Sequence, residues 1–316
     1  MDPICHTLVG ASLGATGLEK KSRYGRATLI IAANLPDVDV ISYVWGETAS
    51  YAFLRGVTHG LPAIVVLPVL LAVVVKLFAR FRLSTGREVL FRWLLILSAL
   101  GVATHPALDW LNNYGMRWLM PIVDEWFYGD TLFIVDWVLW LVLGVGLLAA
   151  GWFRHETLRW FQQPASVSLA FIVAYIAMSF GITQLAEREA LARVANDPPR
   201  GVMASPVPLN PLRRDILLEY DTEYRLGTVL FAPGPQFEWS QTAIPKGDPA
   251  LLERGREQRQ GRQFLRWARF PYSVVDESEG GTVVRLADAR YVVDIENPSR
   301  GTFGLLVLEI PARERH

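Results

Sequence analysis

The sequence is poor in cysteine: Cys5 is the only one among 316 residues. An intramolecular disulfide and a cysteine-rich zinc site are therefore excluded. Net charge is absent as well, because 31 basic residues balance 31 acidic ones, and no basic stripe with interleaved aromatic residues occurs. This composition gives no case for a nucleic-acid partner. No basic segment precedes the first apolar run, so a cleaved signal peptide is not expected.

Long apolar runs are abundant, but only up to about residue 186. We therefore predict an α-helical polytopic membrane bundle at residues 1–186, a linker at 187–212 and a soluble α+β or mostly β domain at 213–316. Most of the runs approach the ~20 residues needed to cross the hydrocarbon core, which gives about six spans. They cover residues 4–18, 27–45, 61–79, 93–111, 132–150 and 167–185.

Basic residues indicate the orientation of these spans, because loops rich in Lys and Arg stay in the cytoplasm. They gather after the first and third runs, and after the fifth at Arg154 and Arg159. The alternate connections hold only Arg55 and Arg117. We therefore expect a multi-pass protein of the inner (plasma) membrane, with the N-terminus and the C-terminal domain on the extracytoplasmic side.

Residues 34–39, Asn-Leu-Pro-Asp-Val-Asp, place two carboxylates inside the second apolar run. One aspartate at the centre of a membrane helix costs about 2.5–3.5 kcal/mol, so two need a compensating partner. On a regular helix Asp37 and Asp39 would point about 200° apart, too far to share one ion. Pro36 disfavours a regular helix just before them. We expect a broken or ending helix that turns both carboxylates toward a bound cation; a helix end that simply reaches water is the alternative.

Further potential ligands fall in the same outer layer as this acid pair. The spacing of His105 and Asp109 puts both side chains on one helical face, within reach of one ion. Threonine precedes two of the histidines, at Thr58 and Thr104, where its hydroxyl either orients the imidazole or caps a helix; capping is the expected role. The predicted metal ligands are His6, Asp37, Asp39, His59, His105 and Asp109.

Other outer-side polar residues are candidates for catalysis and substrate binding. Asp136 lies near the outer end of the fifth run and Asp130 lies just before it. Either is a candidate general base or additional ligand, and a solvated acid beside interfacial tryptophans is the alternative for Asp136. Asn113 and Tyr114 follow Asp109 closely, so we expect them to contact substrate.

The C-terminal part has the short alternating segments and turn residues of a β-rich domain. Strands are expected at 214–220, 225–231, 272–276, 282–286, 291–295 and 303–308. A helix is expected at 250–268. No recognisable nucleotide-binding or catalytic motif occurs here, so substrate gating, partner binding and stabilisation all stay open as roles.

Several motifs of the membrane part resemble one family when they are taken together. They are MDPICHTLVG at 1–10, NLPDVD at 34–39, RGVTH at 55–59, THPALD at 104–109, WLNNYG at 110–115 and IVDW at 134–137. This set resembles the YdjM-like family of inner-membrane proteins, described as predicted membrane-bound metal-dependent hydrolases. The resemblance implies such an activity, with the six predicted ligands as the corresponding polar positions. Leu54 departs from the family, whose members often have histidine there.

Three functions fit these residues. Imidazole and carboxylate groups without competing cysteine suit a divalent metal, zinc above all, in a mononuclear or binuclear site. At the outer interface such a site would meet membrane lipids, so the leading hypothesis is a hydrolase of a lipid or phosphoester substrate. A metal or small-solute transporter, or a non-catalytic membrane anchor with a structural metal, are the alternatives. The apolar inner halves of the runs argue against a transport path.

Overall fold

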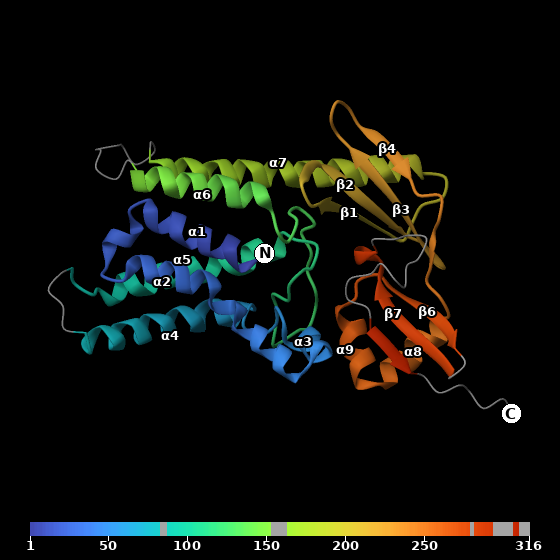
Figure 1. The fold of residues 1–316 in the computed structure, drawn as a ribbon, viewed down its shortest axis with the longest axis horizontal. Helices are drawn as coiled ribbons and strands as arrows, with labels where there is room; N and C mark the ends of the chain where they lie inside the picture. Colours follow the sequence, from blue (N-terminus) through green and yellow to red (C-terminus); the bar gives the residue numbers. More distant parts are fainter. Residues whose placement is uncertain (83–86, 153–162, 279–280, 293–305, 310–316) are drawn as a thin grey trace. The chain divides into compact units, whose positions relative to one another are not determined.

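The computed structural model describes residues 1–82, 87–152, 163–278, 281–292 and 306–309. The chain divides into two compact units (Figure 1). The first, called the helical unit here, comprises Met1–Ile41, Arg55–Ile182 and Pro206–Pro211. The second, called the sheet unit, comprises Ser42–Leu54, Thr183–Ser205 and the chain from Leu212 onward.

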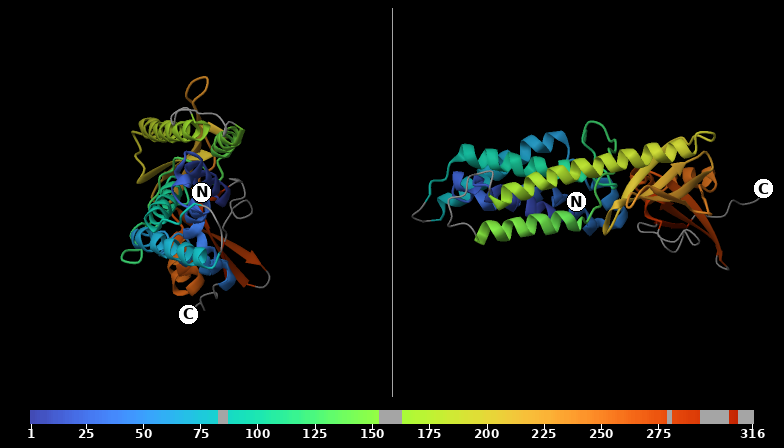
Figure 2. Two further views of the ribbon diagram at one scale, coloured as in Figure 1. Left: turned by 90° about the vertical axis from the view of Figure 1, so that its left-hand side faces the viewer. Right: turned by 90° about the horizontal axis from the view of Figure 1, so that it is seen from above.

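The helical unit is built on α2, which packs against both α1 and α5. In addition α4 packs on α5, and α6 packs on α1; Figure 2 shows these helices from two further sides. The helices are α1 Pro3–Ala15, α2 Gly25–Asn34, α4 Leu61–Arg80, α5 Phe91–Trp110, α6 Trp137–Trp152 and α7 Pro164–Arg193. The last part of α7 belongs to the sheet unit.

Four segments among the described residues are long and apolar enough to cross a membrane. They are Gly25–Trp45, Leu61–Arg80, Phe91–Trp110 and Pro164–Arg193. The expected six spans are therefore not confirmed. With a rise of 1.5 Å per residue, the 13 residues of α1 and the 16 of α6 cover about 20 and 24 Å, less than the ~30 Å hydrocarbon core. The sequence runs looked longer because apolar residues continue into the turns. Arg154 and Arg159 lie outside the described residues.

The contact between α2 and α5 is close because small residues line it. A Cβ added at Gly101 would lie 2.5 Å from the Cβ of Ala32 and 2.9 Å from the carbonyl oxygen of Leu29. Small residues at such a crossing let two helix backbones approach each other. The approach brings the end of α2 next to His105 on α5.

The expected break at Pro36 is confirmed. The α-helix α2 ends at Asn34, and the chain continues as a 3-10 helix at Leu35–Trp45. The Asn34 amide donates to the Ile30 carbonyl oxygen at 2.8 Å and to Thr7 Oγ1 at 3.1 Å, which ties the helix end to α1. Both aspartates of the motif therefore lie just beyond the end of a regular helix.

The sheet unit contains two antiparallel sheets. The first has the order β1-β2-β3-β4, with β5 paired to β3, and the second has the order β6-β7-β8. The strands are β1 Gly201–Val207, β2 Asn210–Glu219, β3 Glu223–Leu230, β4 Gln236–Trp239, β5 Ile244–Pro245, β6 Pro271–Ser278, β7 Gly281–Asp288 and β8 Leu306–Glu309. Its helices are α3 Glu47–Phe53, α8 Pro249–Glu257 and α9 Arg259–Trp267.

The expected strands at 214–220, 225–231, 272–276 and 282–286 coincide with β2, β3, β6 and β7. The helix expected at 250–268 is instead two helices, α8 and α9, because Gln258 between them is extended. Residues 187–212, expected as a linker, contain the end of α7 and all of β1. The strand expected at 291–295 starts in a 3-10 turn, and residues 293–305 lie outside the described part.

Candidate metal centre

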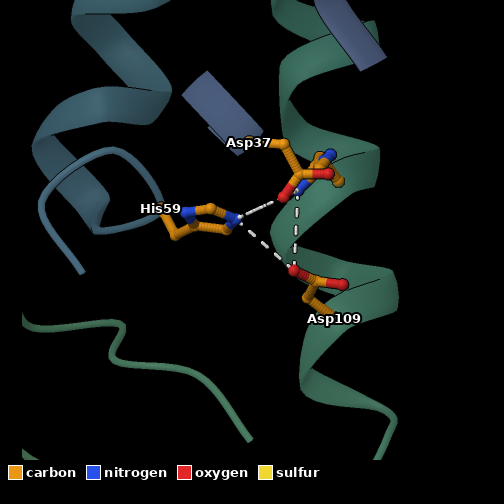
Figure 3. A group of neighbouring side chains, drawn as sticks. Asp37, His59 and Asp109 are labelled. Carbon is orange, nitrogen blue, oxygen red and sulfur yellow. Dashed lines mark hydrogen bonds and ion pairs between the residues drawn. The ribbon is translucent and has the colours of Figure 1, made fainter. Parts of the chain in front are cut away.

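Four side chains from three segments converge at one point of the helical unit. Asp37 comes from the 3-10 helix, His59 from the turn before α4, and His105 and Asp109 from α5. Figure 3 shows Asp37, His59 and Asp109 pointing toward one another. One nitrogen or oxygen atom of each of the four residues lies within 4.8 Å of all the others.

The distances between these atoms fit a metal ion. His59 Nε2 lies 3.5 Å from Asp37 Oδ1 and 3.4 Å from Asp109 Oδ2. The corresponding distances from His105 Nε2 are 3.3 and 3.5 Å, and the two Nε2 atoms are 3.0 Å apart. Metal–ligand bonds of 2.0–2.2 Å in a tetrahedron place neighbouring ligand atoms about 3.3–3.6 Å apart. The four nitrogen–oxygen distances fall in this range, whereas the two Nε2 atoms are closer together.

Hydrogen bonds fix which ring nitrogen of each histidine faces the cluster. His105 Nδ1 lies 2.6 Å from the carbonyl oxygen of Ala33, which can only accept, so Nδ1 carries the proton. His59 Nδ1 lies 3.1 Å from Asp39 Oδ2 in the same way. Both Nε2 atoms thus point at each other and at two carboxylates. In neutral imidazoles these nitrogens carry lone pairs, and four lone-pair donors at this spacing repel one another unless a proton or a metal ion lies between them.

The electrostatics favour positive charge at this point. The side chains of His59, His105 and Asp109 are at most 1% exposed, whereas that of Asp37 is 32% exposed. Burial alone would lower the pKa of the His59 imidazolium. The carboxylates of Asp109, Asp37 and Asp39 outweigh burial and raise that pKa to about 10. The carboxylate field thus attracts either a proton or a metal ion, and the four-atom geometry suits the metal ion.

Asp37 and Asp39 contact opposite sides of the His59 ring. A 3-10 helix turns 120° per residue, so residues two apart point about 240° around the axis from each other. Asp37 consequently faces the Nε2 side of the His59 ring, and Asp39 faces the Nδ1 side. Asp39 is therefore not in the four-residue cluster; it holds one of the cluster's histidines. The structure brings only Asp37 of the pair into the cluster, and a ligand role for Asp39 stays a prediction.

Thr58 completes the support of His59. Its hydroxyl donates to Asp39 Oδ2 at 2.9 Å and lies 3.0 Å from His59 Nδ1. The expected capping role is wrong for this threonine, because its hydroxyl orients the imidazole through Asp39. Thr104 differs, since its hydroxyl bonds the Gly101 carbonyl oxygen within its own helix at 2.8 Å.

Arg55 is a cation at the site that the sequence reasoning missed. Its Nε lies 3.2 Å from Asp109 Oδ2, and its Nη1 donates to Asn112 Oδ1 and to the Gly115 carbonyl oxygen, both at 2.9 Å. The guanidinium lies 4.6 Å from the ring centre of Tyr114. A signal was present, because Arg55 is one of only two basic residues in the connections that the sequence predicts to be extracytoplasmic. Tyr114 is thus beside the site, as expected for a substrate-contacting residue, although its role stays a prediction.

His6 lies next to the cluster without belonging to it. Its ring stacks on His105 with centroids 3.7 Å apart, and its Nε2 lies 3.4 Å from Asp109 Oδ1. The Met1 amino group donates to that same oxygen. His6 therefore contacts two of the four residues, and its role as a ligand stays a prediction.

Among the described residues, the metal-ligand group includes neither Asp130 nor Asp136. Asp136 Oδ1 accepts from the backbone of Val138 and Leu139 at the start of α6, and Oδ2 accepts from the Tyr175 hydroxyl at 2.9 Å. These bonds give Asp136 a capping role. Asp130 is buried with a left-handed φ of 47°, a conformation that aspartate tolerates. Asn113 is also buried. Catalytic roles for the two acids, and substrate binding by Asn113, stay predictions.

The fold and the site together define a class: a helical membrane protein whose buried His/Asp cluster could hold a metal ion. Comparison with known families places the chain more narrowly. The family described as YdjM inner membrane protein matches residues 1–186, so the chain belongs to that family, as the sequence motifs indicated. No curated protein and no solved structure matches the chain.

Proposed function

We propose that this protein is a membrane-embedded metal-dependent hydrolase acting at the outer face of the membrane. The observation that carries the proposal is the set of four converging ligand atoms, in which both histidines have Nδ1 engaged and Nε2 free to bind an ion. Packing alone gives no reason for two buried imidazoles to point their Nε2 atoms at each other.

Asp37, His59, His105 and Asp109 would hold the ion, and nitrogen and oxygen ligands without sulfur suit zinc. When bound, an ion of this type supplies Lewis acidity, which polarises an acyl or phosphoryl oxygen and lowers the pKa of water toward ~7. The residues of the chain fix the ligand orientation, bury three of the ligands and leave Asp37 partly exposed.

Four protein ligands are also the number found in closed structural zinc sites. The unequal exposure of the four ligands favours a catalytic site over a structural one. Asp37 is 32% exposed while the other three ligands are buried, so a substrate group can approach from one direction. A carboxylate on the exposed side is also the ligand best able to yield a coordination position to substrate.

The positive charge of Arg55 and the position of the ligands along the candidate spans indicate the substrate class. Arg55 offers a guanidinium beside Asp109, which favours an anionic group such as a phosphoester. His59, His105 and Asp109 lie at or near the ends of two candidate spans, where membrane and water meet, and Asp37 lies deeper within a third, Gly25–Trp45. A lipid or lipid-linked phosphoester of the outer leaflet therefore suits the site, with the outer side assigned by the positive-inside rule.

The test begins with elemental analysis of detergent-purified protein, wild type beside His105→Ala and Asp136→Asn. We expect near-stoichiometric zinc or another divalent transition metal in wild type and in Asp136→Asn, and strong loss in His105→Ala. Phospholipid and lipid-phosphate hydrolysis is then measured on the same preparations. Hydrolysis by wild type that chelation abolishes and the metal restores would support the proposal.

Two results would count against it. Wild-type protein purified without chelator and free of metal would remove the basis of the site. Stoichiometric metal without hydrolysis, combined with unfolding on chelation, would favour a membrane anchor with a structural ion. Metal-dependent solute uptake into vesicles would instead favour a transporter.

A further inference from the structure

A second candidate site lies at the opposite end of α2 from the metal centre. It is a pocket of about 580 Å³ around the connection before α2 and the start of that helix. Its lining includes three arginines, one acid and two aliphatic residues, which are Arg23, Arg26, Arg87, Glu19, Ala27 and Ile30, together with Ser22, Tyr24 and Gly25. All of these residues belong to the helical unit.

Two hydrogen bonds join the connections that form the pocket. The Arg23 backbone N–H donates to the carbonyl oxygen of Glu88 at 3.1 Å. The Leu90 N–H donates to Ser22 Oγ at 3.1 Å, and Ser22 is buried. These bonds hold the chain before α2 against the chain before α5, although the two segments are far apart in sequence. The pocket is therefore part of the fold of the helical unit.

Positive charge dominates this pocket. Three arginines and a single acid, Glu19, line the pocket; the Glu19 carboxylate lies 3.8 Å from Arg26 Nε, and the Arg23 guanidinium lies over the Tyr24 ring. The Arg26 side chain is 61% exposed, and such surface pairs are weak, so its charge stays available to a ligand. The start of α2 adds N–H groups without helical partners and the positive end of the helix dipole. Lys20 and Lys21, both exposed, directly precede Ser22 of the pocket lining in the sequence.

The remaining wall of the pocket is apolar. Ala27 is exposed and Ile30 is half-buried, and Ile31 beside them is 47% exposed on the same helix. This helix begins a candidate membrane span, so its exposed apolar face suits acyl chains. A free phosphate would use the arginines alone, whereas a phospholipid would use both the arginines and the apolar wall.

We propose that this pocket binds the headgroup of an anionic phospholipid, with its acyl chains along α2. Basic pockets between membrane helices on the cytoplasmic side are typical sites for such headgroups, and the basic connections predict that side here. The phosphate would lie among Arg23, Arg26 and Arg87. This inference is independent of the metal centre and of hydrolysis.

The experiment is native mass spectrometry of the full chain titrated with dioleoylphosphatidylglycerol or dioleoylphosphatidylcholine. The test variant is Arg23→Gln/Arg87→Gln. Arg92→Gln is the matched control, because Arg92 is exposed on α5 outside the pocket and changes charge in the same way. Arg23→Lys/Arg87→Lys keeps the charge and guards against a folding defect. Thermal unfolding in phosphatidylcholine nanodiscs checks that each variant is folded.

We expect wild type to prefer phosphatidylglycerol, and the double glutamine variant to bind it about 25-fold more weakly, about five-fold for each arginine. Arg92→Gln and the double lysine variant should keep most of the affinity. Unchanged affinity in the double glutamine variant, or an equal loss in Arg92→Gln, would overturn the proposal. Displacement of the lipid by inorganic phosphate at similar concentration would overturn the lipid assignment in favour of a simple anion site.

Discussion

Replacing Asp39 by asparagine tests whether its carboxylate orients His59, a candidate metal ligand, while leaving the four candidate ligands in place. Asp39 Oδ2 accepts from the Arg55 backbone N–H and from Thr58 Oγ1, both at 2.9 Å, and lies 3.1 Å from His59 Nδ1. An amide oxygen can still accept these bonds, but it lacks the charge that roughly doubles their strength. Carboxylates that hold metal-binding histidines typically contribute 10–100-fold in metal affinity. We therefore expect Asp39→Asn to weaken metal binding by about 10–100-fold, or about 1.4–2.7 kcal/mol.

The assay is metal content after equilibration with chelator-buffered zinc over a range of free concentrations, which gives an apparent Kd. Asp136→Asn is the matched control, because it makes the same chemical change in the same unit at a carboxylate that caps α6. It should lower thermal stability and leave the Kd unchanged. An unchanged Kd in Asp39→Asn would refute the idea that Asp39 orients His59. Equal weakening in both variants would show general destabilisation instead.

Three further changes test the packing around the site and the sheet unit. Gly101→Ala should lower the free energy of unfolding by about 1–3 kcal/mol, since its Cβ would lie 2.5 Å from that of Ala32; denaturation in detergent measures this. His6→Leu should keep one ion per chain by elemental analysis, because His6 lies outside the four-residue group, although it stacks on His105 and its Nε2 lies 3.4 Å from Asp109 Oδ1; loss of the ion would support the predicted ligand role of His6. Asp288→Asn should lower the free energy of unfolding by about 3–5 kcal/mol, because it breaks a fully buried ion pair with Arg290. The control is Glu223→Gln, in a partly exposed ion pair with Arg225. It should lower the free energy of unfolding by less than about 1 kcal/mol in the same denaturation assay.

Much of the site could be predicted from sequence because its residues are costly in apolar runs. Asp37, His59, His105 and Asp109 each interrupt or border such a run, and this placement needs an explanation that surface residues do not. The same reasoning could not assign Asp39, because its direction depends on the 3-10 twist after Pro36. Composition shows that a helix breaks, but it does not show the turn that replaces it.

The position of Arg55 at the site and the number of membrane spans could not be predicted from the sequence either. Arg55 reads as a loop residue, and its contact with Asp109 exists only because the turn before α4 folds onto α5. Likewise, the apolar runs at 4–18 and 132–150 include residues outside the helices, because α1 ends at Ala15 and α6 begins only at Trp137. The segment holding α3 is a third case, since it lies between membrane helices in sequence yet packs on α9 of the sheet unit. Its Tyr51 stacks on Trp267 with ring centroids 4.6 Å apart.

The helix break explains why the metal centre lies where it does. A helix that ends leaves its last carbonyl groups without N–H partners. The carbonyl oxygen of Ala33, one residue before the end of α2, bonds His105 Nδ1 and so fixes the tautomer of that ligand. The 3-10 turn that follows presents Asp37 to the Nε2 atoms of both histidines. The same turn presents Asp39 to the other nitrogen of His59. One interruption, caused by Pro36, thus supplies a ligand and the acceptors that orient two more, so the break that costs helix stability is also what builds the site.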